Sequence, residues 1–120
     1  PDDAAPLEGL GVDAVWVSNH AGRQFAGSPA AIDMLPAVKA ATNLPLIFDS
    51  GIEGGLDMLR ALALGADFVM MGRAWHYALG AVGTKGAAHL YDMLVDDLKS
   101  NMIQIAATHL SDLPDLLYKY

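Results

Sequence analysis

The sequence contains no cysteine, which excludes a disulfide framework and any metal site built on thiolates. Basic residues are scarce: 7 Lys and Arg stand against 14 Asp and Glu, and the net charge of −7 argues against a nucleic-acid-binding surface. No apolar run reaches the roughly 18 residues that a membrane-spanning helix needs. No two histidines lie at a metal-binding spacing with a carboxylate, so we predict no metal site.

What the chain does contain is typical of one small folded α/β domain. Its 120 residues are 53% hydrophobic, which is enough to bury a core. Short apolar runs at residues 14–18, 44–49 and 67–71 predict strands that are covered on both faces. Trp16, in the first run, is expected to pack within the sheet or barrel. The chain begins with Pro1 rather than Met, and we expect it to be a fragment or a processed piece.

Helical patterns separate these strands. Ser28 is the expected N-cap of a first helix that starts at Pro29 and ends near Ala41, and Pro36 allows a kink or a break within it. Further helices are expected at residues 55–64, 74–80, 87–107 and 112–118. Strands and helices thus alternate with short connections, which is the pattern of right-handed βαβ units in a parallel sheet. Three strands leave a closed barrel and an open sheet as alternatives.

Polar and Gly-rich residues follow the carboxyl ends of all three predicted strands. They are His20 and Arg23 after the first strand, Asp49, Ser50 and Gly51 after the second, and Gly72 and Arg73 after the third. The carboxyl ends of neighbouring parallel strands lie at one edge of a sheet, where α/β proteins build their sites. We therefore expect the three loops to form one site.

The loop after the first strand, residues 18–24, carries a titratable base three residues before a fixed cation. His20 can titrate near neutral pH, and Arg23 offers a planar charged fork that fits a carboxylate. This pair suits a substrate that carries a carboxylate and must lose a proton. The alternative is a polar turn whose His and Arg are only solvated.

Two Gly-rich loops after the second and third strands predict a phosphate site. Residues 49–55 form a strand-to-helix loop whose backbone N–H groups can approach a phosphate at a helix N-terminus. Residues 71–74 add a second loop, in which Arg73 supplies a counter-charge. Two adjacent loops of this kind match the phosphate cradle after the last two strands of (β/α)₈ barrels. Either loop alone is also compatible with an ordinary Gly-rich connection.

These residues resemble the FMN-dependent α-hydroxy acid dehydrogenases and oxidases, a family that includes L-lactate dehydrogenase, lactate oxidase, glycolate oxidase and mandelate dehydrogenase. The similar segments are residues 11–20, 49–52, 61–67 and 72–74. The most specific element is the His-x-Gly-Arg-Gln sequence that begins at His20. Within the family, residues 49–52 and 72–74 are most similar to the bacterial lactate dehydrogenases.

The resemblance implies a (β/α)₈ TIM barrel, an α/β fold of which this chain would supply strands 6, 7 and 8 and the helices that follow them. Residues 1–120 would then be the C-terminal part of a single FMN-binding domain. The segment at Asp2 resembles the start of the helix after strand 5, so the family's catalytic Lys on that strand would precede Pro1. Supporting Tyr and Asp residues would also come from the first half, and we expect the isolated chain to be inactive.

The resemblance also implies roles for the site residues. His20 would be the active-site base, and Arg23 would hold the carboxylate of a small L-2-hydroxy acid, such as lactate, that is oxidised to the 2-keto acid. The implied FMN contacts are Ser18 against the flavin, Asp49, Ser50 and Gly51 along the ribityl-phosphate side, and Gly72 and Arg73 at the phosphate. The implied assembly is a cytoplasmic homo-oligomer, a tetramer in the family, with room for peripheral contact at the inner membrane.

Two residues depart from the family pattern. Ala21 stands where the family usually has Gly, a small change if the backbone φ of Ala21 is below zero. Glu53 stands where the family usually has an Arg near the FMN phosphate. Because a carboxylate would repel the phosphate, we expect Glu53 either to turn to solvent or to be compensated by another cation.

Two other interpretations stay open at the level of the sequence. One is a different FMN- or phosphate-binding TIM barrel, similar to inosine-monophosphate dehydrogenase or isopentenyl isomerase; those enzymes share the Gly-rich loops but lack Ser-Asn-His-x-Gly-Arg-Gln. The other is a non-catalytic phosphate-binding module built on half a barrel. The presence of both His20 and Arg23 disfavours the module. A flavin absorbance spectrum would separate the two enzyme interpretations from it.

Overall fold

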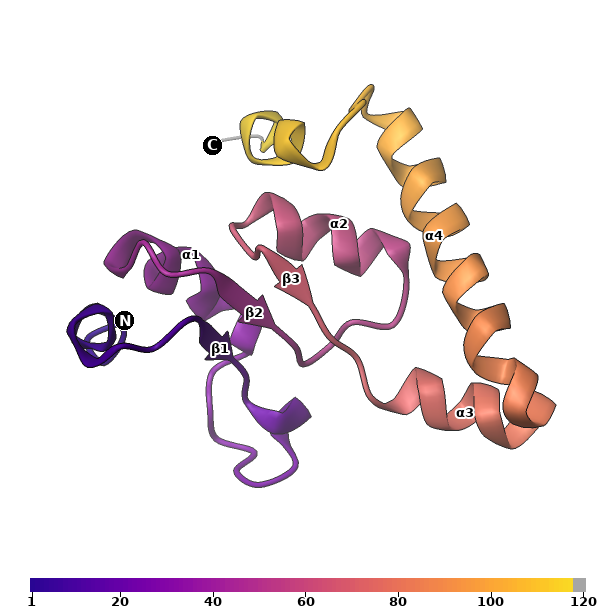
Figure 1. The fold of residues 1–120 in the computed structure, drawn as a ribbon, viewed down its shortest axis with the longest axis horizontal. Coiled ribbons are helices and arrows are strands. Elements are labelled where there is room, and N and C mark those ends of the chain that lie inside the picture. Colours follow the sequence, from indigo (N-terminus) through magenta and orange to yellow (C-terminus); the bar gives the residue numbers. More distant parts are fainter. Residues whose placement is uncertain (118–120) are drawn as a thin grey trace.

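Three short strands form one parallel sheet in the computed structural model, which describes residues 1–117. The strands β1 (Val15–Val17), β2 (Leu46–Phe48) and β3 (Phe68–Val69) lie side by side in the order of the sequence (Figure 1). Each predicted strand is therefore confirmed, although each is shorter than the apolar run that predicted it. The parallel order brings the carboxyl ends of all three strands to one edge of the sheet.

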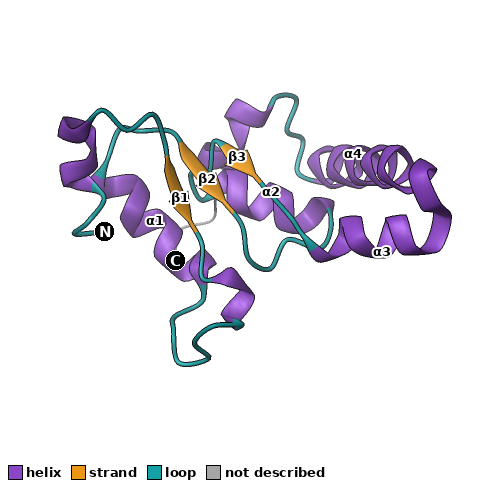
Figure 2. Ribbon diagram, turned by 60° about the horizontal axis from the view of Figure 1, so that its bottom comes forward, coloured by secondary structure: helices purple, strands orange, loops and turns teal. Residues whose placement is uncertain are grey.

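Two helices connect the strands and cover one side of the sheet. Helix α1 (Ala31–Ala41) joins β1 to β2, and helix α2 (Gly55–Ala63) joins β2 to β3. Figure 2 shows both helices on the same side of the strands, as right-handed crossovers require. Leu35 of α1, Phe48 of β2 and Ala61 of α2 are completely buried in the core between them. The α/β class predicted from the sequence is confirmed.

The other face of the sheet is uncovered within residues 1–117. The strand register places Trp16 of β1, Ile47 of β2 and Phe68 of β3 in one row across this face. Trp16 is 56% exposed and Phe68 is 62% exposed. Trp16 does not pack between the sheet and its helices, because side chains alternate along a strand and only the neighbours of Trp16 face the helices; its packing within a barrel stays a prediction.

The remaining elements follow β3; two of them pack against α2, and the other two pack against the long helix between them. They are helix α3 (Arg73–Val82), the 3₁₀ turn η3 (Gly83–Lys85), helix α4 (Gly86–Gln104) and the 3₁₀ helix η4 (Leu110–Leu116). Helix α4 contacts both α2 and α3 along its length (Figure 1). The helices predicted at 74–80 and 87–107 are confirmed. The helix predicted at 112–118 is largely the 3₁₀ helix η4, and Tyr118 lies outside the described residues.

The start of α1 differs from the sequence-based expectation. Ser28 is not the N-cap, because its hydroxyl donates to the Phe25 carbonyl at 2.9 Å and the helix begins only at Ala31. Pro36 lies inside α1, yet the helix continues without a break. The loop between β1 and α1 is therefore longer than predicted, and the residues of its first half are free to form the site described below.

A 3₁₀ helix, η1 (Ala5–Leu10), precedes the sheet and is tied to the end of α1. The Glu8 carboxylate accepts hydrogen bonds from the Asn43 amide at 2.5 Å and from the Thr42 hydroxyl at 2.8 Å. These bonds, the Asn43 amide first, lower the pKa of Glu8 below its ordinary value.

None of the helices within residues 1–117 combines the length and the apolar character that a bilayer crossing requires.

Candidate active site

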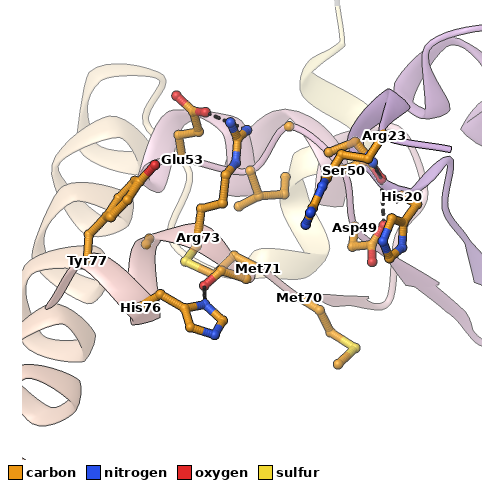
Figure 3. A pocket seen from close by; sticks show the side chains of 15 residues that line it. His20, Arg23, Asp49, Ser50, Glu53, Met70, Met71, Arg73, His76 and Tyr77 are labelled. Carbon is orange, nitrogen blue, oxygen red and sulfur yellow. Dashed lines mark hydrogen bonds and ion pairs between the residues drawn. The ribbon is translucent and has the colours of Figure 1, made fainter. Parts of the chain in front are cut away.

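The three loops at the carboxyl edge of the sheet line one pocket of about 440 Å³. The structure thus brings seven of the eight residues that the sequence singled out to one pocket, and their roles stay predictions. The seven residues are His20, Arg23, Asp49, Ser50, Gly51, Gly72 and Arg73. Ser18 instead lines a neighbouring pocket, together with Phe25 and Met34, and His20 borders both pockets. The side chains of the main pocket form two groups (Figure 3).

The first group lies on the loop after β1, which turns sharply at η2 (His20–Gly22). His20 and Ala21 have positive φ angles of 55° and 54°. The His20 amide donates to the Ser18 hydroxyl at 3.1 Å, and the Arg23 amide donates to the His20 carbonyl at 3.2 Å. This turn aims both the imidazole and the guanidinium at the pocket, with Arg23 extending toward its middle (Figure 3).

Ala21 therefore adopts the left-handed conformation that glycine tolerates best. The condition under which Ala21 would be a small change, a φ below zero, is not met: the angle is +54°. For a residue with a Cβ this conformation costs about 1–2 kcal/mol. Ala21 in place of the family's usual Gly is thus a strained substitution, so other contacts must hold the loop in this shape.

Ser50 supplies those contacts from the neighbouring strand. Its hydroxyl accepts hydrogen bonds from the Ala21 amide at 3.1 Å and from the Asn19 amide at 3.3 Å, and it donates to Asp49 Oδ1 at 2.7 Å. The loop after β2 thus fixes the backbone on both sides of His20. Sequence reasoning assigned Ser50 to the cofactor, and its bonds to the β1 loop could not be read from the sequence because they join residues about 30 positions apart.

The second group lies on the loops after β2 and β3. Gly51 has a φ of 94°, and neither Gly51 nor Gly72 has an atom within 4 Å of the place where a Cβ would stand. A ligand can therefore approach the backbone closely at both glycines. Helix α3 begins at Arg73, so the amides of Arg73 and Ala74 have no partner within the helix, and both residues line the pocket.

The two charged side chains of this second group form an ion pair. Arg73 Nη2 lies 3.0 Å from Glu53 Oε1, and the two side chains are 60% and 71% exposed (Figure 3). The sequence left two outcomes for Glu53, exposure to solvent or compensation by a cation. Both occur, and the compensating cation is the same Arg73 that was predicted to bind phosphate.

The N-terminus of α2 is capped in part by carboxylates of the chain itself, which the sequence of the loop 49–55 did not indicate. The Gly55 amide donates to Asp97 Oδ2 of α4 at 2.5 Å, and the Glu53 amide donates to Asp57 Oδ2 at 3.2 Å. A Cβ on Gly55 would overlap with the backbone of Leu98. Asp97 therefore occupies the first amide of α2, and that amide is not available to an anion in the pocket.

Two pocket residues were missed by sequence reasoning. His76 and Tyr77 both line the pocket from α3, and His76 Nδ1 lies 3.1 Å from the Gly72 carbonyl oxygen. Their spacing from Gly72 and Arg73 is the signal that could have found them, because residues three and four apart share one face of a helix.

Among residues 1–117, no group of three or more His, Asp or Glu side chains could hold a metal ion.

Comparisons with known proteins agree with this geometry. The sequence model of a family described as FMN-dependent dehydrogenase matches residues 1–119. An L-lactate oxidase of Alicycliphilus denitrificans is 44% identical over 115 residues, which cover 94% of this chain and 32% of the oxidase. An L-lactate dehydrogenase of Bartonella tribocorum is 42% identical over 115 residues, which cover 94% of this chain and 30% of that enzyme.

The fold matches solved structures equally well. The structure of an (S)-mandelate dehydrogenase variant superposes with a TM-score of 0.92 at 36% identity, over 99% of this chain and 34% of the dehydrogenase. This chain thus spans about a third of the length of the relatives that it matches. Because the family match extends over nearly every residue, the chain belongs to the FMN-dependent dehydrogenase family, whose cofactor is the FMN expected from the sequence.

Proposed function

We propose that this chain supplies the base, the carboxylate clamp and the phosphate loops of an FMN-dependent oxidoreductase that converts a lactate-like L-2-hydroxy acid to the 2-keto acid. The observation that carries the proposal is the shared pocket: His20 and Arg23 project into it from one loop, and Gly51, Gly72 and Arg73 line it from the next two. Relatives named lactate oxidase and L-lactate dehydrogenase support the hydroxy acid as substrate.

Residues 1–120 are, in this proposal, the C-terminal part of a single TIM-barrel domain, with β1, β2 and β3 as strands 6, 7 and 8. The uncovered row of Trp16 and Phe68 supports it, because the inner face of a closed barrel would bury both side chains. A buried acceptor adds support: Asn19 Oδ1 has no hydrogen-bond donor among residues 1–117, and a buried polar atom normally has one. A segment that completes the barrel would cover the Trp16 and Phe68 side chains and would donate a hydrogen bond to Asn19 Oδ1.

The volume of the pocket and most of the hydrogen-bond donors and cations that line it are compatible with the FMN of the family. Pockets for cofactors and other small molecules occupy about 300–1,000 Å³, a range that includes the observed value. Gly51 and Gly72 allow a close approach of the phosphate to the backbone, and Arg73 offers a cation. Asp49 and Ser50 would line the ribityl side and Ser18 would lie at the flavin. When bound, FMN supplies the redox chemistry by accepting two electrons from the substrate.

His20 and Arg23 have separate tasks in the proposed reaction. Arg23 makes no ion pair with any residue among 1–117, so its guanidinium is available for the two oxygens of a substrate carboxylate. A carboxylate bound there would hold the hydroxyl-bearing carbon near His20, because both side chains leave the same short turn. A ring nitrogen of His20 would then accept the proton that the substrate loses.

The proposal is tested by substitution in the complete protein. His20→Asn should leave FMN bound and lower kcat by about 10²- to 10⁴-fold, the usual effect of losing a general base. Arg23→Lys should raise KM for lactate, because a point charge cannot reproduce the planar fork. His89→Asn, which changes an exposed histidine of α4 outside the pocket, is the matched control.

Turnover is followed by bleaching of the flavin absorbance on addition of each 2-hydroxy acid. Near-normal turnover in His20→Asn would remove His20 from the role of base. A complete protein without flavin absorbance would favour the non-catalytic module. A flavin that binds and is bleached by no 2-hydroxy acid would refute the proposed substrate class, although the family match favours this function over the other flavin barrels. The homo-oligomer and the cytoplasmic or peripheral location stay predictions from the resemblance.

A further inference from the structure

The two pocket arginines are in different electrostatic states. Arg73 is already paired with the Glu53 carboxylate at 3.0 Å, whereas Arg23 has no ion pair among residues 1–117. Glu53 leaves the loop after β2, beside the open glycine Gly51, and its partner begins α3. Arg73, which directly follows the open glycine Gly72, is therefore already paired with a carboxylate of the chain itself.

A bound phosphate would need the same guanidinium group. Phosphate and carboxylate both bind an arginine through paired N–H···O bonds, so the two anions compete for one fork. An anion at Arg73 would also meet the negative charge of Glu53 at close range. At the α2 side, the Gly55 amide is not available to replace Arg73, because it already donates to Asp97.

The competing carboxylate is free to leave. The Glu53 side chain is 71% exposed. The backbone of Glu53 is fixed by a hydrogen bond from its amide to Asp57 Oδ2 at 3.2 Å. Releasing Arg73 therefore requires rotation of one exposed side chain and no movement of the loop. The Glu53 carboxylate thus competes with any anionic ligand for Arg73. Breaking the ion pair costs little free energy, as expected for an exposed pair.

We propose that Glu53 competes with the cofactor phosphate for Arg73 and thereby weakens the binding of FMN relative to riboflavin, which has no phosphate. This inference rests on the proposed function and makes Glu53 a residue that sets cofactor affinity and specificity. Wild-type protein then gains little from the phosphate of FMN, since binding exchanges one anion for another at Arg73.

The experiment titrates the flavin-free complete protein with FMN and with riboflavin, and measures Kd by quenching of flavin fluorescence. Glu53→Gln keeps the size of the side chain and removes its charge. It should tighten FMN binding by about 1.5- to fivefold, the range expected when one exposed charge–charge competitor is removed. Riboflavin binding should not change. Asp92→Asn, an exposed carboxylate of α4 outside the pocket, is the control and should alter neither Kd.

Salt dependence and a second substitution separate competition from a structural effect. Between about 0.05 M and about 0.3 M NaCl, the Kd of FMN should rise more steeply for Glu53→Gln than for the wild type, because Arg73 is then an unpaired cation. In an Arg73→Gln background, Glu53→Gln should lose most of its effect on FMN, as a double-mutant cycle requires.

The outcomes distinguish this inference from the function on which it rests. If the wild type binds FMN but Glu53→Gln leaves its Kd unchanged, or shifts FMN and riboflavin equally, the competition is refuted and the FMN site stands. If none of the variants binds either flavin, the proposed function is refuted and the inference with it.

Discussion

Ser50→Ala is expected to loosen the turn that carries His20. The substitution removes the oxygen that accepts the Ala21 amide at 3.1 Å and the Asn19 amide at 3.3 Å. Each such bond contributes about 0.5–1.5 kcal/mol, so together they account for about 1–3 kcal/mol of the free energy of unfolding. The strain of the positive φ angles at His20 and Ala21 then has less to oppose it, and the turn should open before the rest of the domain.

A matched pair of variants isolates the hydroxyl from the backbone. Ser50 itself has a φ of 78°, which alanine keeps at a cost and glycine adopts freely. Ser50→Gly loses the same hydrogen bonds as Ser50→Ala but should be more stable than it by about 0.5–1 kcal/mol. Ser100→Ala, whose hydroxyl donates only within α4, should change stability by less than about 0.5 kcal/mol.

Two measurements check this prediction in the complete protein. Denaturant unfolding gives the change in free energy, and hydrogen exchange reports the protection of the Asn19 and Ala21 amides. The reasoning fails if Ser50→Ala unfolds within about 0.3 kcal/mol of the wild type, the usual limit of resolution, and both amides keep their protection. A loss of stability without faster exchange at these two amides would place the effect outside the turn and would also refute it.

Two further predictions concern stability. Ala21→Gly should raise the free energy of unfolding by about 0.5–1 kcal/mol, because relief of the strained φ of 54° exceeds the extra backbone entropy of glycine; a lower denaturant midpoint would contradict it. Burial raises the pKa of Asp67, but the Leu46 amide at 2.8 Å and the Lys39 ammonium at 3.0 Å outweigh it and hold the pKa below the ordinary 3.8. A lowered pKa means that Asp67 stabilises the fold fully above pH 3.8 and less as the pH falls through its folded value; thermal unfolding against pH should therefore show a shallower acid loss in Asp67→Asn.

The strands and the shared site edge were predictable because they depend on local sequence. Apolar runs bounded by turn residues identified all three strands, and short connections implied their parallel order. The parallel order in turn placed His20, Gly51 and Arg73 at one edge, as the pocket confirms. The position of a residue can be predicted from the sequence where it depends only on its own strand and on the neighbouring strand.

The contacts between distant loops were not predictable in this way. Ala21 keeps a positive φ because Ser50, on the loop after β2, holds the turn; the residues next to Ala21 in the sequence give no such signal. Asp97 reads as one of several solvated acids on an amphipathic helix, yet it caps α2 at Gly55. Such pairings depend on how helices pack in three dimensions, which residue spacing along one helix does not specify.

The capping of α2 by Asp97 also links the length of α4 to the geometry of the pocket. Helix α4 starts beside α3, which carries Arg73, and runs past the N-terminus of α2, where Asp97 meets Gly55 (Figure 1). The distance between the two Gly-rich loops therefore depends on helix α4 as well as on the sheet. One residue inserted into α4 before Asp97 would turn that carboxylate by about 100° around the helix axis, away from Gly55. Insertions and deletions in this helix, far from the substrate, would thus act on cofactor binding.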